Sequence, residues 1–282
     1  MTRVSIIITC YNKGQYVADA INSALLQTYE DIEIVCVNDG SSDNSSEIIR
    51  TFANKYKNIL FFDNQENKGV IFARNMAIDA ATGKYIFPLD ADDTIDTTYI
   101  EKAAKILDEN PDIGVVTSEA KIFGAKNKKY RLPEFDKETM LFENCIFSSS
   151  MFRKADFIDV GRYKENMAYG CEDWDLWLSF MENNYNVYRI PEVLFNYRVL
   201  IEKQRSNFAQ ENKNIWLKNM VKNHIDLYFD SANFAEAVTC NVKQLKKKYK
   251  TYKKGFNILL QLSIAEFLAL FIILAIIFRN WI

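Results

Sequence analysis

The sequence predicts an α/β protein whose mostly parallel sheet carries helices on both faces. Short apolar segments alternate with segments of helical spacing through the first hundred residues, and the connections between them are short. The apolar segments are continuous β-branched runs, as expected of strands that are buried on both faces. Ligands of such sheets bind at the carboxyl ends of the strands, so the residues that follow each strand are candidates for the functional site.

The first ninety residues predict four strands and three helices. The second helix should begin after Ser41-Ser42-Asp43, because these side chains provide N-cap chemistry. The other helices are expected over Gln15–Leu26 and Gly69–Ala81. The expected strands are Val4–Thr9, Glu33–Val37, Ile59–Phe62 and Lys84–Leu89.

Beyond residue 90 the pattern becomes less regular. A helix is expected from about Thr97 to Pro111, and the chain after Asn207 should be mainly helical. The polar, basic segment Lys121–Lys137 is typical of an exposed loop. The remaining expected elements are strands at Ile113–Ser118, Cys145–Phe152, Asn186–Ile190 and Val193–Arg198, the last two on either side of Pro191, and a short helix at Trp174–Met181.

Composition excludes several classes of protein. The chain has 282 residues, with 35 basic and 37 acidic side chains and a formal net charge of -2, so a nucleic-acid-binding protein is not expected. The five cysteines are odd in number and form no CxxC pair, which argues against a disulfide framework or a structural zinc site and favours reduced thiols in the cytosol. A Cys171 nucleophile lacks a neighbouring histidine, because His224 is the only one in the chain.

The charge is unevenly distributed, because the C-terminal end is basic and apolar. Seven lysines lie between Lys243 and Lys254, and residues 1–242 carry a net charge of about −9. The apolar segment Phe256–Phe278 is long enough to cross a hydrocarbon core of about 30 Å as a helix. Glu266 opposes insertion by about 2.5–3.5 kcal/mol, and each Leu, Ile or Phe favours it by about 0.3–0.6 kcal/mol.

We therefore expect this tail to bind a membrane, either as a spanning helix or at the interface. The lysines favour the anionic cytoplasmic leaflet, which places the body of the protein at the cytoplasmic face of the cell membrane. The alternative is a helix buried against a partner or a second subunit.

Three carboxylates follow the fourth predicted strand. Asp90, Asp92 and Asp93 are so close in sequence that their like charges should raise one another's pKa. A cation would relieve this repulsion, and hard oxygen ligands in small number suit Mg²⁺ or Mn²⁺. The alternative is that they cap the helix that starts near Thr97.

Two more acidic groups lie where a ligand could bind. Asp39 follows the second predicted strand, although an aspartate before glycine is also typical of an Asx-turn. Glu172 and Asp173 precede Trp174, and an aromatic-flanked carboxylate is suited to act as a general base. The alternative is that these acids only complement a helix dipole.

Two phosphate-binding motifs are absent from the sequence. No GxGxxG follows the first strand, and no GxxxxGK[ST] occurs anywhere. If a nucleotide diphosphate binds, a metal and basic side chains must meet its charge. Lys68, Arg74, Arg198 and Arg205 are the candidates, although most single bases are solvated surface residues.

Several ordered segments resemble the family 2 glycosyltransferases. The resemblance covers roughly residues 2–200, and it rests on the order and spacing of the motifs together. It implies a GT-A fold over residues 1–206, with a nucleotide-binding half (1–118) and an acceptor half (119–206), followed by a basic helical extension (207–254) and an apolar helix (255–282). The matching segments are Val4–Lys13, Val37–Asp43, Asn67–Gly69, Ala73–Asn75, Gly83–Asp93, Gly161 and Glu172–Trp177.

The resemblance also implies roles for individual residues. Asp173 would be the catalytic base and Asp92 would hold the divalent metal, Mg²⁺ or Mn²⁺. Glu172 and Trp174 would lie on the acceptor side. The donor would be bound by Thr9, Tyr11, Asp39, Lys68, Arg74, Asp90 and Arg198.

The implied reaction is inverting transfer of a sugar from a nucleotide sugar, UDP-linked in the first instance, to a hydroxyl of a cell-surface glycan or a lipid-linked oligosaccharide. One departure concerns the diphosphate: Leu200 stands where many members have a histidine, so Arg198 or Arg205 would substitute for it. Two other functions are alternatives. Intact Asp92 and Asp173 argue against a non-catalytic scaffold, and a nucleotidyltransferase would need a glycine-rich N-terminal loop.

Overall fold

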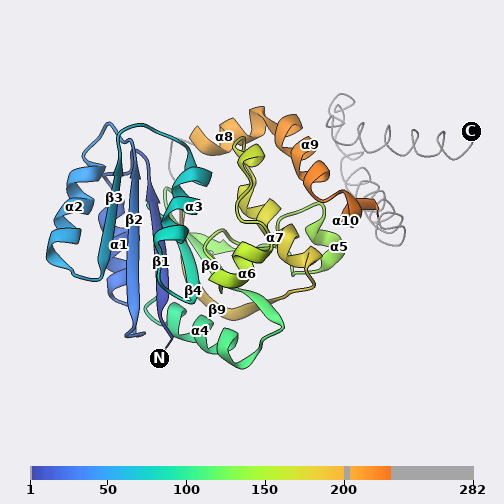
Figure 1. The fold of residues 1–282 in the computed structure, drawn as a ribbon, viewed down its shortest axis with the longest axis horizontal. Helices are drawn as coiled ribbons and strands as arrows, with labels where there is room; N and C mark the ends of the chain where they lie inside the picture. The colour runs from blue at the N-terminus through green and yellow to red at the C-terminus, as the bar shows by residue number, and fades with distance from the viewer. Residues whose placement is uncertain (1, 200–203, 230–282) are drawn as a thin grey trace, which may run out of the picture.

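A single mixed sheet organises the chain, and Figure 1 shows helices packed around it. The computed structural model describes residues 2–199 and 204–229. In this part of the chain nine strands pair in the order β3-β2-β1-β4-β8-β6-β9-β5, with β7 added at β6. The strands are β1 (Val4–Cys10), β2 (Ile32–Asp39), β3 (Ile59–Asn64), β4 (Tyr85–Asp90), β5 (Thr94–Ile95), β6 (Ile113–Gly124), β7 (Lys128–Tyr130), β8 (Met151–Arg153) and β9 (Asn186–Val199).

Strands β3, β2, β1 and β4 form the parallel part that the sequence predicts. Their crossover helices are α1 (Val17–Leu25), α2 (Ser45–Lys55) and α3 (Val70–Ala80). The register pairs Thr9 with Val37 on one side and with Asp90 on the other. The polar residues after these strands therefore meet at one edge of the sheet.

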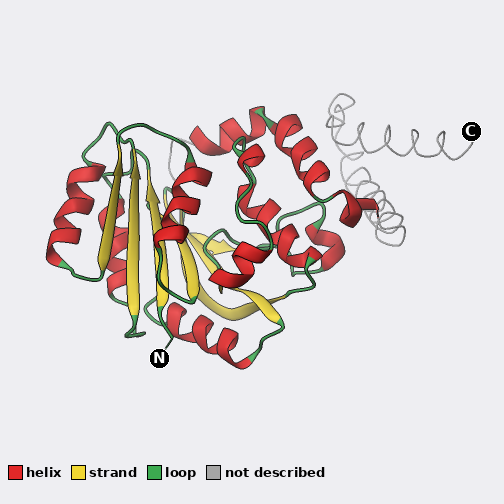
Figure 2. Cartoon of the chain, viewed as in Figure 1, coloured by secondary structure: helices red, strands yellow, loops and turns green. Residues whose placement is uncertain are grey.

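Helices cover both faces of the sheet, as Figure 2 shows. Successive strand residues point to opposite faces, so Ile6 and Ile8 pack in one apolar cluster with α1 and α4 (Tyr99–Glu109), whereas Ile7 packs in the other with α3. The predicted fold class, an α/β sheet flanked by helices, is confirmed.

The second half of the sheet contains more strand than the sequence predicts. The basic segment predicted as a loop over Lys121–Lys137 instead holds the end of β6 and all of β7, which form an antiparallel hairpin. Lys121 is exposed and Ile122 is buried, so the lysines lie on the solvent side of an amphipathic strand. Because lysines are so numerous in this segment, the alternation of exposed and buried side chains was not recognised in the sequence.

Two further strand predictions were wrong in detail. Over Cys145–Phe152 only the last two residues belong to a strand, because Ser150 forms local turn bonds with the carbonyls of Phe147 and Ser148. Pro191 does not divide β9, which is one strand. The β6–β9 register shifts beside Pro191, and this irregularity accommodates the residue that lacks an N–H.

The C-terminal helices lie across the top of the molecule in Figure 1. The helical character predicted after Asn207 is confirmed for the described residues. The later helices are α5 (Lys137–Met140), α6 (Lys154–Asp159), the 3₁₀ helix η1 (Glu165–Met167), α7 (Glu172–Glu182), α8 (Gln204–Glu211), α9 (Lys213–Asn223) and α10 (Ile225–Phe229).

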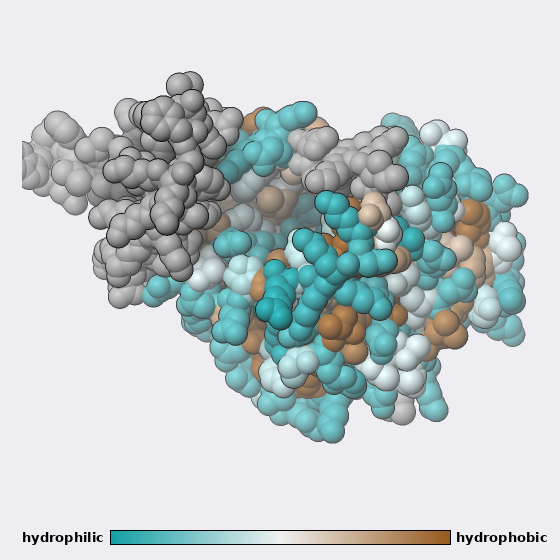
Figure 3. All heavy atoms as spheres, turned by 180° about the vertical axis from the view of Figure 1, so that it is seen from behind, coloured by the Kyte–Doolittle hydropathy of each residue, from teal (hydrophilic) through white to brown (hydrophobic). Residues whose placement is uncertain are grey.

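The predicted membrane tail (255–282) and most of the basic extension (207–254) lie outside the described residues. Within residues 2–199 and 204–229, no helix combines the length and apolar character that crossing a bilayer requires. The face turned away in Figure 1 is mostly hydrophilic over its described part, with apolar side chains in small groups (Figure 3).

A buried carboxylate on β2 connects β1 with the segment before β4, at the amino-terminal ends of the parallel strands. Glu33 accepts hydrogen bonds from the Ser5 hydroxyl, from the amide and hydroxyl of Thr82, and from the Gly83 amide. Burial alone would raise the pKa of Glu33, but these bonds, with Ser5 foremost, outweigh it and the pKa is lowered.

We predict that Glu33→Ala lowers the free energy of unfolding by about 3 kcal/mol at pH 7, because it leaves buried donors unpaired. A carboxyl whose folded pKa is lowered stabilises the protein above its unfolded pKa, so the wild type should lose this advantage as the pH falls below 4.5. Urea unfolding at several pH values measures both effects. The exposed Glu30→Ala is the control, and an equal loss in the two variants would contradict the prediction.

Candidate functional site

The carboxylates after β4 lie together at the sheet edge and face cations. The Lys13 ammonium lies 2.7 Å from Asp92 Oδ2, and the Asp92 side chain is 20% exposed. Asp93 is buried and accepts a 2.6 Å hydrogen bond from the backbone N–H of Arg198. Burial, followed by the charges of Asp92 and Asp90, raises the pKa of Asp93 well above its ordinary value. The repulsion expected from the sequence is therefore present at Asp93.

The helix-cap alternative for these aspartates is not supported. Helix α4 begins after Thr98, and Asp96 accepts the backbone N–H of Thr98 at 3.1 Å. Asp92 and Asp93 instead face Lys13 and the Arg198 backbone.

The loop after β1 is fixed against the loop after β2. The backbone N–H of Asn12 donates to Ser41 Oγ at 2.9 Å, and the backbone N–H of Gly14 donates to Asp43 Oδ2 at 2.8 Å. Asn12 adopts a left-handed backbone conformation (φ 51°) that turns the chain here. These contacts hold Thr9 at the end of β1 and leave the Tyr11 side chain 48% exposed at the same edge.

Asp39 orders the loop that precedes α3. Its buried carboxylate accepts hydrogen bonds from the backbone amides of Lys68 and Gly69, at 3.1 and 2.8 Å, and from the Asn64 side chain at 3.0 Å. These partners lie in the next loop rather than in the Asp39 turn itself, which argues against the simple Asx-turn. The exposed Lys68 ammonium lies 4.8 Å from the centroid of the Phe72 ring.

Arg74 joins the end of β4 to the start of α7. Its guanidinium is only 2% exposed and contacts Asp90 Oδ1 at 2.6 Å and Glu172 Oε1 at 2.8 Å. Burial lowers the pKa of Arg74, but the nearby charges, Asp90 foremost, raise it well above its ordinary value. The charged side chain therefore links two segments that lie 98 residues apart at Arg74 and Glu172.

Helix α7 carries the predicted base in its first turn. Gly170 and Cys171 both have positive φ, at 129° and 58°, and this lead-in directs Glu172 inward and leaves Asp173 half-buried. Asp173 Oδ1 accepts the N–H of Trp174 at 2.8 Å, and Oδ2 lies 3.4 Å from Asn144 Nδ2.

The acids of this first turn do more than complement the helix dipole. Glu172 is held by Arg74, and Asp175 is paired with His224. The Trp174 indole is buried and donates to the Met140 carbonyl at 2.7 Å, so Glu172 and Trp174 lie in the packed interior beside Asp173.

Arg198, from the end of β9, closes the site near Asp92. Its Nε donates to the Asp92 carbonyl at 2.7 Å, and its Nη2 lies 2.8 Å from Asp19 Oδ2. The guanidinium also lies 4.3 Å from the centroid of the Phe123 ring. Leu200, where the motif departs from the resemblance, lies outside the described residues.

The sequence did not identify two groups that the structure places at the site, Lys13 and Asn144. Lys13 lies in a matching motif, but nothing in the sequence pairs it with Asp92, 79 positions later. Asn144 reaches Asp173 from a segment that immediately precedes a predicted strand. Asp93 was named with its acidic cluster, but the structure buries it rather than turning it toward a ligand. The sequence feature that could have indicated Lys13 is its position shortly after the end of the first strand.

The residues at Asp92 fit a divalent cation that takes most of its ligands from a phosphate group and water. Asp92 already attracts a cation, the Lys13 ammonium, and hard carboxylate oxygens suit Mg²⁺ or Mn²⁺. Over the described residues no three His, Cys, Asp or Glu side chains are grouped to hold a metal by themselves. Mg²⁺ commonly binds through one or two carboxylates together with substrate phosphates, so a small donor set agrees with this fit.

A hollow of about 290 Å³ opens beside the half of the sheet formed by β6, β7 and β9. Its aromatic wall includes Tyr130, whose ring centroid lies 5.6 Å from that of Tyr197. Burial and then the charge of Asp173 raise the pKa of Tyr130. The lining residues are Ser118, Glu119, Lys129, Tyr130, Arg131, Leu132, Glu134, Phe147 and Arg189.

The comparisons with known proteins identify the class to which this α/β sheet, with its acidic strand ends and the acidic motif on α7, belongs: the glycosyltransferases with a GT-A-like fold. The sequence profile described as glycosyl transferase family 2 matches residues 5–170. The chain belongs to this family.

Related sequences carry the same general description. An uncharacterized glycosyltransferase of Haemophilus influenzae is 29% identical over 86% of this chain and 79% of its own length. An uncharacterized glycosyltransferase of Methanocaldococcus jannaschii is 31% identical over 74% of each chain.

Solved structures share the fold at low identity. A TarS fragment (1–349) of S. aureus in complex with UDP-GlcNAc superposes with a TM-score of 0.62 and 19% identity, over 81% of this chain and 73% of that one. The mannosyltransferase PcManGT of Pyrobaculum calidifontis, in complex with GDP-Man and Mn²⁺, superposes with a TM-score of 0.59 and 16% identity, over 99% and 83%.

We predict that Arg74→Met lowers the free energy of unfolding by about 3–5 kcal/mol, because two carboxylates near the interior lose their shared cation. Arg50→Met is the matched control. Arg50 is likewise paired, with the single carboxylate of Asp63, but its side chain is 57% exposed, so the expected loss is at most about 1 kcal/mol. Guanidinium unfolding measures both. A loss at Arg74 as small as that at Arg50 would contradict the bridging role.

Proposed function

We propose that this glycosyltransferase moves a sugar from a nucleotide sugar, UDP-linked in the first instance, to an acceptor hydroxyl with inversion at the anomeric carbon. The observation that carries the proposal is the Arg74 bridge, because it holds the acidic strand end of β4 beside the helix that bears Asp173. Nucleotide sugars bound to two solved structures of the same fold support this choice of donor class.

The donor would lie along the edge formed by the ends of β1, β2 and β4. Thr9 and Tyr11 would border the nucleotide, and Asp39 would accept from its base while ordering the Lys68 loop. Asp90 would approach the ribose or the sugar. The diphosphate would meet the positive charge of Lys68, Arg74 and Arg198.

For Arg74 this contribution would be electrostatic, because its guanidinium is buried between Asp90 and Glu172. Lys13, which belongs to no phosphate-binding motif, adds a further positive charge beside Asp92.

Asp92 would hold Mg²⁺ or Mn²⁺, and the bound ion would offset the negative charge of the leaving diphosphate. The other tasks fall to side chains of the chain itself. Lys68 and Arg198 would orient the diphosphate, and Asp90 would bind the ribose or the sugar of the donor.

Asp173 would remove the proton from the acceptor hydroxyl. The resulting oxygen nucleophile attacks the anomeric carbon, a new glycosidic bond forms, and the bond to the nucleoside diphosphate breaks with its electrons on the phosphate oxygen. Asn144 and the Trp174 amide hold the two carboxylate oxygens. One displacement inverts the configuration and needs no covalent sugar–enzyme intermediate, unlike the retaining route.

The acceptor would enter through the hollow beside β6 and β7. Its aromatic wall suits the apolar face of a sugar ring, and Arg131 and Lys129 line it as cations. The expected acceptor is a hydroxyl of a cell-surface glycan or a lipid-linked oligosaccharide. The donor would be bound by one half of the domain (1–118) and the acceptor by the other (119–206). The C-terminal tail would place the enzyme at the cytoplasmic face of the membrane.

The test is a donor panel. Purified full-length protein is incubated with Mn²⁺ or Mg²⁺, nucleotide sugars of several bases, and membrane extract as the acceptor source. Release of nucleoside diphosphate from at least one donor, dependent on the extract, is the expected result. No release from any donor would overturn the proposed activity.

We predict that Asp173→Asn lowers the transfer rate by about 10²–10⁴-fold, because an amide cannot take the proton from the acceptor. Donor binding, measured by calorimetry, should change less than twofold. Glu143→Gln removes an exposed carboxylate of the neighbouring segment and should leave both unchanged. Unchanged turnover of Asp173→Asn would refute its role as the base.

We predict that Tyr130→Ala raises the acceptor KM about tenfold, equivalent to about 1.4 kcal/mol, and leaves the donor KM unchanged. The reason is the loss of the aromatic wall of the hollow. Tyr188→Ala removes an aromatic ring that is 42% exposed and not part of that wall, so it serves as the control. A change in the donor KM instead would assign Tyr130 to donor binding and contradict the prediction.

A further inference from the structure

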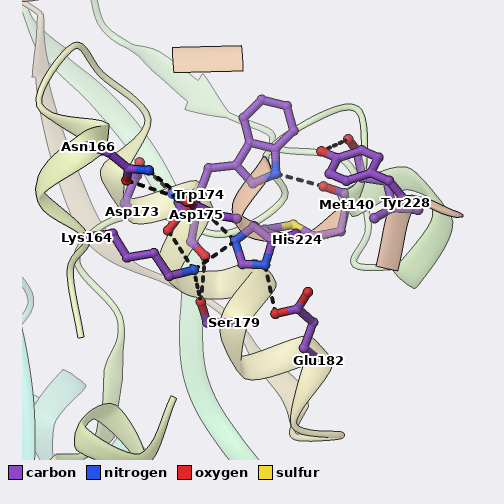
Figure 4. A network of polar contacts seen from close by, with 12 residues as sticks. Met140, Lys164, Asn166, Asp173, Trp174, Asp175, Ser179, Glu182, His224 and Tyr228 are labelled. Atoms are coloured by element: carbon purple, nitrogen blue, oxygen red, sulfur yellow. Dashed lines mark hydrogen bonds and ion pairs between the residues drawn. The ribbon is translucent and has the colours of Figure 1, made fainter. Parts of the chain in front are cut away.

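The only histidine of the chain is buried against the helix that carries Asp173. His224 caps the C-terminal end of α9, directly before α10, and is 1% exposed. Its Nε2 lies 3.0 Å from Asp175 Oδ1, and its Nδ1 lies 2.9 Å from Glu182 Oε2 (Figure 4). One imidazole therefore spans two carboxylates, nearly two turns apart, on α7.

Other polar groups complete the contact around Asp175, which is fully buried. Lys164 Nζ lies 3.3 Å from Asp175 Oδ2 and 3.0 Å from the Ser179 hydroxyl. The Asn223 amide donates to Asp175 Oδ1 at 2.8 Å. Figure 4 shows Lys164, from the segment before η1, and His224, from the end of α9, converging on Asp175 of α7.

Two carboxylates on opposite sides of the ring favour its protonated form, in which Nδ1 and the Glu182 carboxylate form an ion pair without hydrogen-bond geometry. A neutral imidazole has one N–H and one lone pair, so one of its nitrogens would direct a lone pair at a carboxylate. Burial lowers the pKa of His224, but the bonds to Asp175 and Glu182 outweigh it and the pKa is raised. The end of α9 also favours a cation, whereas the Lys164 ammonium, 3.4 Å from Nε2, opposes one.

Asp175, the central carboxylate of the network, lies within one helical turn of the proposed base. Asp175 follows Asp173 by two residues, and Trp174 between them packs against Trp216 of α9, with ring centroids 6.1 Å apart. Helix α9 therefore holds the first turn of α7 at two points, the tryptophan pair and His224. A small shift of this turn would move the Asp173 carboxylate.

We propose that protonated His224 is a positioning residue for Asp173: it fixes α9 and α10 to α7 and so sets the orientation of the base. This inference rests on the proposed transfer activity. Neither His224 nor Glu182 touches the donor or the acceptor in the arrangement proposed above. The effect therefore appears in the rate of the chemical step rather than in substrate binding.

The sign of the pH dependence follows from the charge. A base whose folded pKa is raised keeps its stabilising pair intact at low pH and loses it as the pH rises through the folded pKa. The transfer rate of the wild type should therefore fall on the alkaline side. The pKa of Asp175 is lowered, and Glu182 and Lys164 are the other charged groups that face the ring.

The test compares full-length wild type, His224→Gln and Glu182→Gln between pH 6 and 10. His224→Gln should lower kcat about tenfold or more, change the donor and acceptor KM less than twofold, and lose the alkaline limb. Glu182→Gln keeps the ring but removes one opposite charge, so the alkaline limb should move about one pH unit lower. Glu211→Gln, an exposed carboxylate on α8, is the control.

A second measurement does not depend on turnover. With ¹³C-labelled histidine the chain gives one imidazole signal, which should titrate above pH 6.5 in the wild type and at lower pH in Glu182→Gln. Equal kcat and pH profiles in the three proteins, or a signal that titrates below pH 6.5, would overturn the inference. If the wild type transfers no sugar from any donor, the proposed function fails, and the titration then shows separately whether the charged contact exists.

Discussion

The buried guanidinium of Arg74 is the contact on which the arrangement of the site depends. It lies between Asp90, at the end of a central strand, and Glu172, at the start of α7. Two charges buried away from water are costly unless their geometry is good and their remaining hydrogen bonds are satisfied. Because one cation serves both carboxylates, the parallel half of the sheet and the helix with Asp173 are fixed relative to each other.

The same principle explains how several acidic groups coexist at one sheet edge. Asp92 faces Lys13, and Asp93 lies beneath the Arg198 backbone with its pKa raised by burial and by its acidic neighbours. Positive charge is thus already present beside the two partly exposed carboxylates of this cluster, Asp90 and Asp92. An anionic diphosphate with a divalent ion would enter a site that is electrostatically balanced, rather than one that is simply acidic.

The parallel strands and the residues at their ends could be predicted from sequence, because an apolar run ending in Asp39 or Asp90 is a local pattern. The partners of these residues could not, since Lys13 and Asp92 are 79 positions apart and Arg74 and Glu172 are 98 apart. Local composition also misled where context decides: the lysines of β6 and β7 are the solvent side of a hairpin, and a bulge accommodates Pro191 in β9. His224, isolated in sequence, acquires two carboxylate partners only through the fold.

The most direct test of the account is a crystal structure of the protein grown with UDP and Mn²⁺, with anomalous scattering used to locate the manganese. We expect an ion at Asp92 beside the diphosphate, the Lys13 ammonium displaced from Asp92, and the Arg74 bridge to Asp90 and Glu172 unchanged. Manganese and UDP bound away from the ends of β1, β2 and β4, with Lys13 still paired to Asp92, would contradict it.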